Sequence, residues 1–227
     1  MGAPEWVFYA EGMPPTDAAP LPAHPDVEIE DRSRVWQGWA ALDLIRFRHR
    51  RFDGGMSELR TWEVLRRGHA VAVLPYDPDA DALVLMEQFR LPALAAGVDP
   101  VMVEIPAGFR DGGESIEAAL VRETREEIGL EPDHLVKIGD FVLSPGGSDE
   151  LVTIFIGRVR APVAAANGIA GIGGLASEHE DIRVRVWPAD EAIAAVMAGG
   201  IPNSVTAIAL LWFALRRHGL RREWMGS

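Results

Sequence analysis

A helix predicted near the middle of the chain is both preceded and followed in the sequence by predicted strands, and this order limits the possible folds. Ser115 to Ile128 carries apolar residues near one face, and Gly129 follows as a stop signal. Further helices are predicted at about 189–198 and 203–218. This order predicts a mixed α+β fold. The predicted strands are 69–77, 80–90, 101–108, 135–143, 151–159 and 182–188.

The segment before these strands divides into two parts. Residues 1–26 are rich in proline and alanine without a period, which predicts a flexible N-terminal arm. Residues 27–65 are predicted to form a small N-terminal antiparallel β-domain, with a hairpin turn at 53–56. This section is short, so we expect it to pack on another part of the protein or on a second subunit. Residues 66–227 then form the main domain.

Composition excludes several classes of function. The 227 residues carry a formal net charge of −12, which argues against a general nucleic-acid binder. The absence of cysteine excludes disulfides and thiolate catalysis and fits a cytoplasmic protein. The beginning of the chain lacks a secretory signal pattern. No apolar run approaches the roughly 20 residues that span a membrane.

The predicted central helix concentrates negative charge on one face. Glu123, Glu126 and Glu127 lie three and four residues apart, a spacing at which like charges destabilise a helix by roughly 0.2–0.5 kcal/mol per pair. Such a face is either a solvated surface or a site for a divalent cation, which prefers oxygen ligands. A glycine-containing loop leads into this helix, and Arg122 can hold carboxylates in place through a bidentate contact. These neighbours favour the cation site.

The loop and helix resemble the Nudix box. Gly108 is followed after five residues by Glu114, then after seven by Arg122-Glu123, and the pattern closes with Glu126-Glu127 and Gly129-Leu130. The one soft departure is Thr124, where the family prefers an aliphatic residue. The resemblance implies a divalent cation, magnesium with manganese as the alternative, that polarises a pyrophosphate.

Segments outside the box are similar to the bacterial ADP-ribose pyrophosphatases within this family. They are EIPAG at 104–108, SPGGSDE at 144–150 and GGLASEHEDIRVRV at 173–186. This resemblance implies a Nudix α/β/α sandwich behind an N-terminal β-domain, assembled as a domain-swapped homodimer. It also implies hydrolysis of ADP-ribose to AMP and ribose 5-phosphate. The alternatives are hydrolysis of another nucleotide sugar such as GDP-mannose, or a regulator that binds ADP-ribose without cleaving it.

The resemblance also implies roles for individual residues. The metal ligands would be the carbonyl of Ala107 with Glu123 and Glu127, and Glu114 would support the metal site. Glu126 and Arg122 would belong to the catalytic group with Glu178, the expected general base. Glu180 is the rival for that role. Expected substrate contacts are Trp62, Glu63, Arg90 and Glu150.

Trp62 departs from the best-known bacterial relative, which has an arginine there. It could stack on adenine or pack at a dimer interface. The glycine- and alanine-rich segment 161–177 is predicted to be mobile and suits a loop that closes over substrate. The basic run Arg46 to Arg51 is interpreted as a solvated or subunit-facing strand edge. His69 and His179 are interpreted as packing or surface residues.

Overall fold

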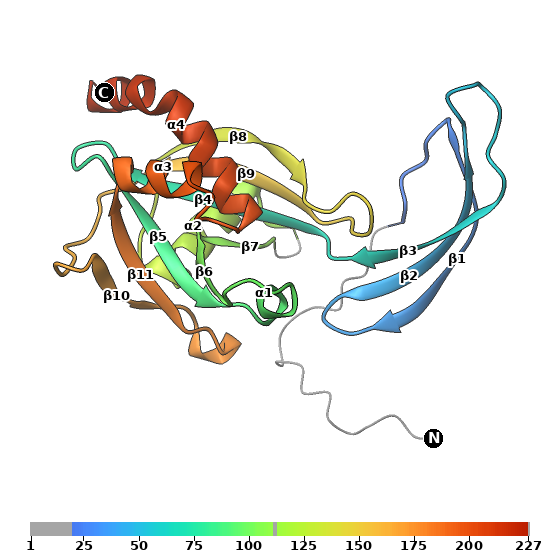
Figure 1. Cartoon of the computed structure of the whole chain (residues 1–227), viewed down its shortest axis with the longest axis horizontal. Coiled ribbons are helices and arrows are strands. Elements are labelled where there is room, and N and C mark those ends of the chain that lie inside the picture. The colour runs from blue at the N-terminus through green and yellow to red at the C-terminus, as the bar shows by residue number, and fades with distance from the viewer. Residues whose placement is uncertain (1–19, 111–112, 227) are drawn as a thin grey trace. The chain divides into compact units, whose positions relative to one another are not determined.

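The computed structural model describes residues 20–110 and 113–226, and the chain divides into two compact units (Figure 1). The first unit runs through Gly68 and also takes in Val142–Glu150. The second unit consists of His69–Phe141 and Leu151 onward. Most of the predicted N-terminal arm, residues 1–19, lies outside the described residues.

The first unit is a three-stranded antiparallel sheet in the order β1-β2-β3. Its strands are β1 (Val27–Gln37), β2 (Ala41–His49) and β3 (Arg60–Arg66). Pairing of β2 with β3 confirms the predicted hairpin. Arg66 is buried and reaches both Asp43 on β2, at 3.1 Å, and Asp149 of the segment 142–150, at 2.5 Å. That segment is therefore attached to β3 by an ion pair.

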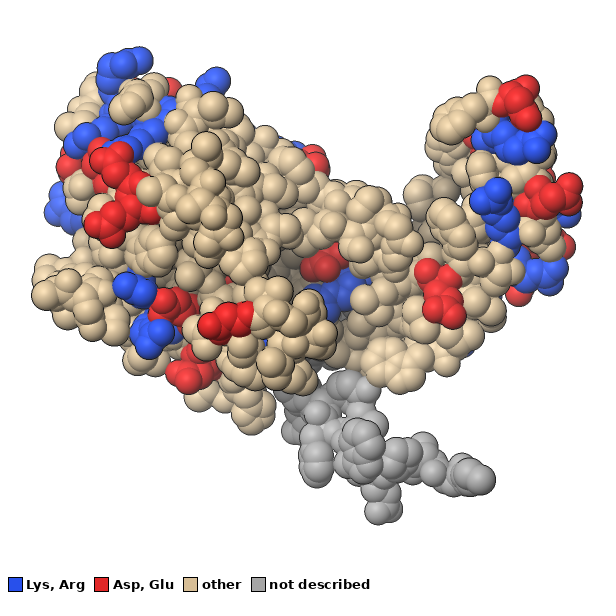
Figure 2. All heavy atoms as spheres, in the orientation of Figure 1, with Lys and Arg blue, Asp and Glu red and all other residues tan. Residues whose placement is uncertain are grey.

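The basic run on β2 is paired with acidic residues. Arg46 lies 3.8 Å from Glu30, and the guanidinium of Arg50 lies 2.7 Å from the Asp26 carboxylate. On the face drawn in Figure 2, basic and acidic side chains are interspersed over this unit. Strand β2 is the central strand of this sheet, between β1 and β3, so the predicted strand edge is wrong. The exposed arginines pair with acidic residues, as expected for a solvated surface.

The second unit is built on an eight-stranded mixed sheet in the order β10-β11-β5-β4-β9-β8, with β6 on β5 and β7 on β4. The central strand β4 runs parallel to β9 and antiparallel to β5 and β7. Nearly every residue of β4, β5 and β9 is buried, as expected for strands covered on both faces. The strands are β4 (His69–Asp77), β5 (Ala82–Phe89), β6 (Val101–Glu104), β7 (Ala107–Phe109), β8 (His134–Val142), β9 (Leu151–Arg158), β10 (Ile169–Gly173) and β11 (Ile182–Pro188).

Helices cover both faces of this sheet and confirm the predicted α/β/α sandwich. On one face, Leu120 of α2 (Ile116–Ile128) packs with Val73 and Phe155 of the sheet. On the other, Phe213 of α4 (Ser204–Met225) lies 4.7 Å from the ring of Tyr76. The remaining helical segments are α1 (Leu91–Ala95), η1 (Ala176–Glu178) and α3 (Ala189–Met197).

Local chemistry fixes the ends of α2 where the sequence predicts them. Ser115 caps its start, with the hydroxyl accepting the backbone N–H of Ala118 at 3.1 Å. Gly129 ends it in the left-handed conformation, at φ 71°, where glycine avoids a steric penalty. The acidic face therefore has a defined position relative to the loop before it.

Four features of the structure differ from the sequence prediction. Segment 161–177 contains β10, which pairs with β11, and the predicted strand 101–108 is divided at Ile105-Pro106 into β6 and β7. The last helix runs to Met225 rather than 218, because Leu220 and Trp224 are buried beyond Gly219. The short α1 was not predicted. In the described part of the chain, no helix has the length and apolar character to cross a membrane.

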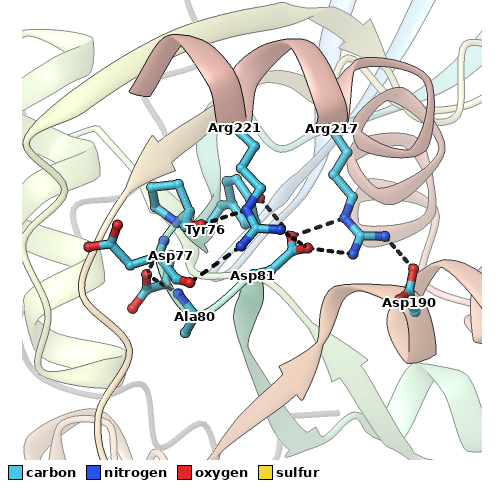
Figure 3. A network of polar contacts seen from close by, with 9 residues as sticks. Tyr76, Asp77, Ala80, Asp81, Asp190, Arg217 and Arg221 are labelled. Atoms are coloured by element: carbon cyan, nitrogen blue, oxygen red, sulfur yellow. Dashed lines mark hydrogen bonds and ion pairs between the residues drawn. The ribbon is translucent and has the colours of Figure 1, made fainter. Parts of the chain in front are cut away.

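Helix α4 is fastened to the turn between β4 and β5 by a polar network (Figure 3). Asp81, at φ 53°, accepts hydrogen bonds from Arg217 at 2.7 and 3.0 Å and from Arg221 at 2.8 Å. It also accepts the Tyr76 hydroxyl at 2.7 Å, and Arg217 pairs with Asp190. The Arg217 hydrogen bond lowers the pKa of Asp81 below its ordinary value, so the carboxylate stays charged.

Candidate active site

The acidic face of α2 is organised around one guanidinium. Arg122 donates to both oxygens of Glu114 at 3.1 and 3.2 Å, which is a bidentate contact of the predicted kind. Its Nη1 donates to Glu123 at 2.8 Å and to Glu126 at 3.2 Å. Its Nη2 also donates to the carbonyl of Phe109 at 3.0 Å. Arg122 thus ties the glycine loop to the helix and gathers three of the predicted carboxylates.

Glu127 points in a different direction from these three. It is 2% exposed, and its Oε2 accepts the backbone N–H of Ala107 at 2.9 Å. Its carboxylate is therefore held beside the residue whose carbonyl is the expected metal ligand. The contact joins the last turn of α2 to the first residue of β7.

Gly108 leaves the space in which the Glu123 carboxylate lies. A Cβ atom at this position would lie 2.0 Å from the Glu123 Oε1, well inside van der Waals contact. Any side chain here would have to displace that carboxylate. The glycine that opens the Nudix-like pattern therefore has a direct steric reason in this structure.

Two carboxyls of α2, those of Glu123 and Glu127, lie in an environment that disfavours their charged form. Burial raises the pKa of Glu123 to about 7, while Arg122 opposes the rise and Glu126 and Glu178 add to it. Burial also raises the pKa of Glu127 well above its ordinary value; the Ala107 N–H opposes this, and the charges of Glu123 and Glu180 increase it. Burial is thus the main cause of both raised pKa values, and neighbouring carboxylates add to it.

The loop that carries Glu178 and Glu180 begins against the end of α2. The backbone N–H of Gly174 donates to the carbonyl of Glu126 at 3.1 Å. Glu178 is exposed at the end of η1, whereas Glu180 accepts the backbone N–H of Leu175 at 3.1 Å. The structure brings both candidate bases within electrostatic reach of the helix carboxylates but assigns the role to neither.

Arg90 lies at the end of β5 and belongs to the same region of the second unit. Burial lowers the pKa of its guanidinium, but its hydrogen bonds to the Glu104 carboxylate and the charges of Glu104, Glu127 and Glu180 outweigh this and raise it. The Arg90 side chain is 44% exposed, so a ligand can reach it. An arginine beside the carboxylates supplies the positive charge that an anionic substrate needs.

The other three expected substrate contacts belong to the first unit. Trp62 and Glu63 are on β3, and Glu150 ends the segment 142–150. Trp62 is 53% exposed, with its ring 5.2 Å from that of Phe47 in an edge-on arrangement. Glu150 lies 3.5 Å from Arg67. Their roles toward substrate stay predictions.

The donor set of the second unit suits a divalent cation. Carboxylates on α2 and the Ala107 carbonyl are hard oxygen donors, the type that magnesium and manganese prefer. The Glu123 carboxylate lies against Gly108, and its raised pKa fits a site that a bound cation would stabilise. Among the described residues, the acidic and histidine side chains do not already converge in a group of three that could hold a metal, because Arg122 lies between the glutamates.

An α/β/α sandwich that presents a glycine loop and a carboxylate-rich helix defines the class of Nudix proteins. The chain belongs to the Nudix family: the NUDIX domain matches residues 66–205. Proteins of this family generally use a divalent metal ion.

Named relatives are similar to almost the whole chain. It is 42% identical to the ADP-ribose pyrophosphatase of Escherichia coli (strain K12), over 88% of this chain and 93% of the relative. Identity is 35% to the ADP-ribose pyrophosphatase of Haemophilus influenzae, covering 89% and 92%. It is 33% to the GDP-mannose pyrophosphatase of Yersinia enterocolitica, covering 74% and 84%. A crystal structure of an ADP compounds hydrolase has the same fold, with a TM-score of 0.64 and 17% identity over 88% of this chain and 98% of that one.

Sequence reasoning missed two contributors to this region. Glu104 begins the segment EIPAG but has no predicted role, and the structure shows it as the buried partner of Arg90. Gly173 begins the segment 173–186 that carries the resemblance but has no predicted role of its own, and a Cβ there would lie 1.9 Å from the carbonyl oxygen of Glu127. Neither role has a local sequence signal, because each depends on a contact between distant segments.

Proposed function

We propose that the protein is a Nudix pyrophosphohydrolase that cleaves the pyrophosphate of ADP-ribose to AMP and ribose 5-phosphate. The observation that carries this proposal is the clustering of the α2 carboxylates, Arg90 and the Glu178 loop in one unit, in a chain 42% identical to an ADP-ribose pyrophosphatase. GDP-mannose is the second candidate substrate, because GDP-mannose pyrophosphatases are also relatives.

In this proposal, Glu123, Glu127 and the Ala107 carbonyl hold the metal, with Glu126 adjacent and Glu114 supporting them through Arg122. Magnesium, or manganese in its place, would supply charge neutralisation at the pyrophosphate and activation of water. Arg122 holds the Glu114, Glu123 and Glu126 carboxylates in place through its hydrogen bonds.

The chain's own residues then bind and orient the substrate. Arg90 contacts a phosphate oxygen, and Glu178 takes the proton from the attacking water. We place Trp62 and Glu63 near the adenine and Glu150 at the substrate. Exposure of Trp62 is compatible both with stacking on a base and with packing at a subunit interface.

We also propose a homodimer that works in the cytoplasm. The three-stranded unit exposes several large apolar side chains, which supports association with a second copy. They are Val35, Trp36, Trp39 and Trp62.

The test is a phosphate-release assay on the purified protein with magnesium and added phosphatase, across ADP-ribose, GDP-mannose and related nucleotide sugars. We expect ADP-ribose to be the preferred substrate. Glu178→Gln should lower turnover by about 10²- to 10⁴-fold, the usual contribution of a general base. Glu180→Gln should have a much smaller effect.

Glu117→Gln is the control for the same chemical change, because Glu117 is an exposed glutamate on the first turn of α2. It should leave turnover unchanged. Near-full activity of Glu178→Gln would exclude that residue as the base, and absence of turnover on every substrate would exclude the enzymatic function.

A further inference from the structure

Glu104 is a buried carboxylate shared between two side chains from distant parts of the chain. Its oxygens accept three hydrogen bonds from the Arg90 guanidinium, at 2.8, 3.1 and 3.2 Å. Its Oε1 also accepts the side-chain amide of Asn203 at 3.2 Å. Glu104 itself is 6% exposed, so its orientation depends on these partners rather than on water.

Asn203 uses both ends of its side-chain amide. Its Oδ1 accepts the backbone N–H of Thr206 at 2.9 Å and caps the start of α4, while its Nδ2 donates to Glu104. The cap alone would be served equally well by serine or aspartate. Neither of those residues supplies an amide donor toward Glu104 as well. The choice of asparagine therefore has a reason beyond helix capping.

The Glu104 contact determines which part of Arg90 faces outward. A bidentate carboxylate occupies Nε and one terminal nitrogen and fixes the plane of the guanidinium. The remaining N–H groups point away from Glu104, and the side chain stays partly exposed. Binding then needs little further ordering of Arg90, which reduces the entropic cost of contact with an anion.

We propose that Asn203 is a positioning residue for substrate binding, which acts by holding Glu104 and, through it, the plane of the Arg90 guanidinium. The inference rests on the proposed role of Arg90 at the pyrophosphate. It connects the first turn of α4, the end of β6 and the end of β5 in one hydrogen-bonded chain, so α4 contributes to substrate affinity without touching substrate.

The experiment compares Asn203→Ser and Asn203→Asp, both of which keep a cap acceptor for Thr206. Asn203→Ser removes the donor to Glu104, and Asn203→Asp replaces it with a second carboxylate. We expect the KM for ADP-ribose to rise about three- to tenfold in Asn203→Ser, with kcat changed less than about twofold and with the melting temperature retained. Asn203→Asp should raise KM further.

Asp190→Asn is the control for an exchange between amide and carboxylate at the start of a helix. Asp190 lies in the first turn of α3, and its side chain is 86% exposed. This exchange should leave KM unchanged. A double-mutant cycle with Arg90→Ala then tests the route: if Asn203 acts through Arg90, Asn203→Ser has no further effect on KM once Arg90 is removed.

A second measurement is independent of activity. The Arg90 Nε–H resonance, assigned by its loss in Arg90→Lys, should exchange slowly with water in the wild-type protein and faster in Asn203→Ser. If the wild-type protein fails to hydrolyse ADP-ribose but this exchange responds to Asn203→Ser, the proposed function fails and the positioning role stands. Unchanged exchange in Asn203→Ser, or the same KM effect with and without Arg90, would overturn the inference.

Discussion

Replacement of Gly173 by alanine should damage both stability and catalysis, because the backbone there passes directly over the last turn of α2. The added Cβ would lie 1.9 Å from the carbonyl oxygen of Glu127 and 2.9 Å from its carbonyl carbon. Both atoms are backbone, so no side-chain rotation relieves the contact. The start of the 173–180 loop must move away from the helix by roughly 1.5 Å to restore van der Waals distance.

The size of the effect follows from two losses. Overpacking of this kind costs about 1–3 kcal/mol. The neighbouring hydrogen bond from Gly174 to the Glu126 carbonyl, 3.1 Å long, would break for roughly 0.5–1.5 kcal/mol more. At about 2–4 °C per kcal/mol for a chain of this size, the melting temperature should fall by about 3–18 °C. A displacement of about 1 Å in the Glu178 loop can also lower turnover by roughly 10²-fold.

Differential scanning calorimetry and release of AMP from ADP-ribose would measure the two effects. Gly219→Ala is the control, because that glycine is in α4 with open space around it. It should be neutral or stabilising, since alanine favours helix. A melting temperature of Gly173→Ala within about 2 °C of wild type, together with turnover within twofold, would refute the steric argument.

Two further predictions concern the cation site and the α4 network. Added magnesium should raise the melting temperature of the wild-type protein, because binding to the folded state stabilises it, and Glu127→Gln should reduce that rise in the same thermal assay. Arg217→Met should lower the free energy of unfolding in urea by roughly 2–4 kcal/mol, because the variant leaves Asp81 with fewer partners for its buried charge, whereas Asp190→Asn, at an exposed site, should be indistinguishable from wild type. Since Arg217 lowers the pKa of Asp81 below its ordinary 3.8, this stabilisation is complete above about that pH and is lost as pH falls through the lower folded value. The difference between wild type and Arg217→Met should therefore shrink in acid; a constant difference at all pH values would contradict the assignment to Asp81.

The central fold was predictable because its signals are local. The apolar runs of β4, β5 and β9 predict strands buried on both faces, and Ser115 and Gly129 bracket α2 with capping chemistry. Prediction failed where tertiary packing decided the outcome. Helix α4 continues past Gly219 because Leu220 and Trp224 are buried, which local propensity does not reveal.

The candidate site divides in the same way. Arg122 and Glu126 lie four residues apart in one helix, so their contact follows from sequence. The contacts of Arg122 with Glu114, which precedes the helix, and with the adjacent Glu123 depend on how the loop and side chains are placed in the fold. The contact between Glu127 and Ala107 joins residues 20 positions apart in the sequence. The contact between Glu104 and Asn203 joins residues 99 positions apart. Such contacts depend on the folded tertiary structure, and a single sequence carries no signal for them.

The first unit contains two separate segments of the chain, and this limits how its N-terminal part can be deleted or exchanged. The Leu65 N–H donates to the Gly147 carbonyl at 2.8 Å, and the Asp149 N–H donates back to Leu65 at 3.1 Å. Deletion of residues up to Gly68 would therefore leave 142–150 without its pairing partners, in the middle of the remaining polypeptide. An exchange of N-terminal segments between relatives should keep its architecture only if 142–150 is transferred with it. The three-stranded sheet therefore cannot be removed or exchanged on its own, although it comes first in the chain.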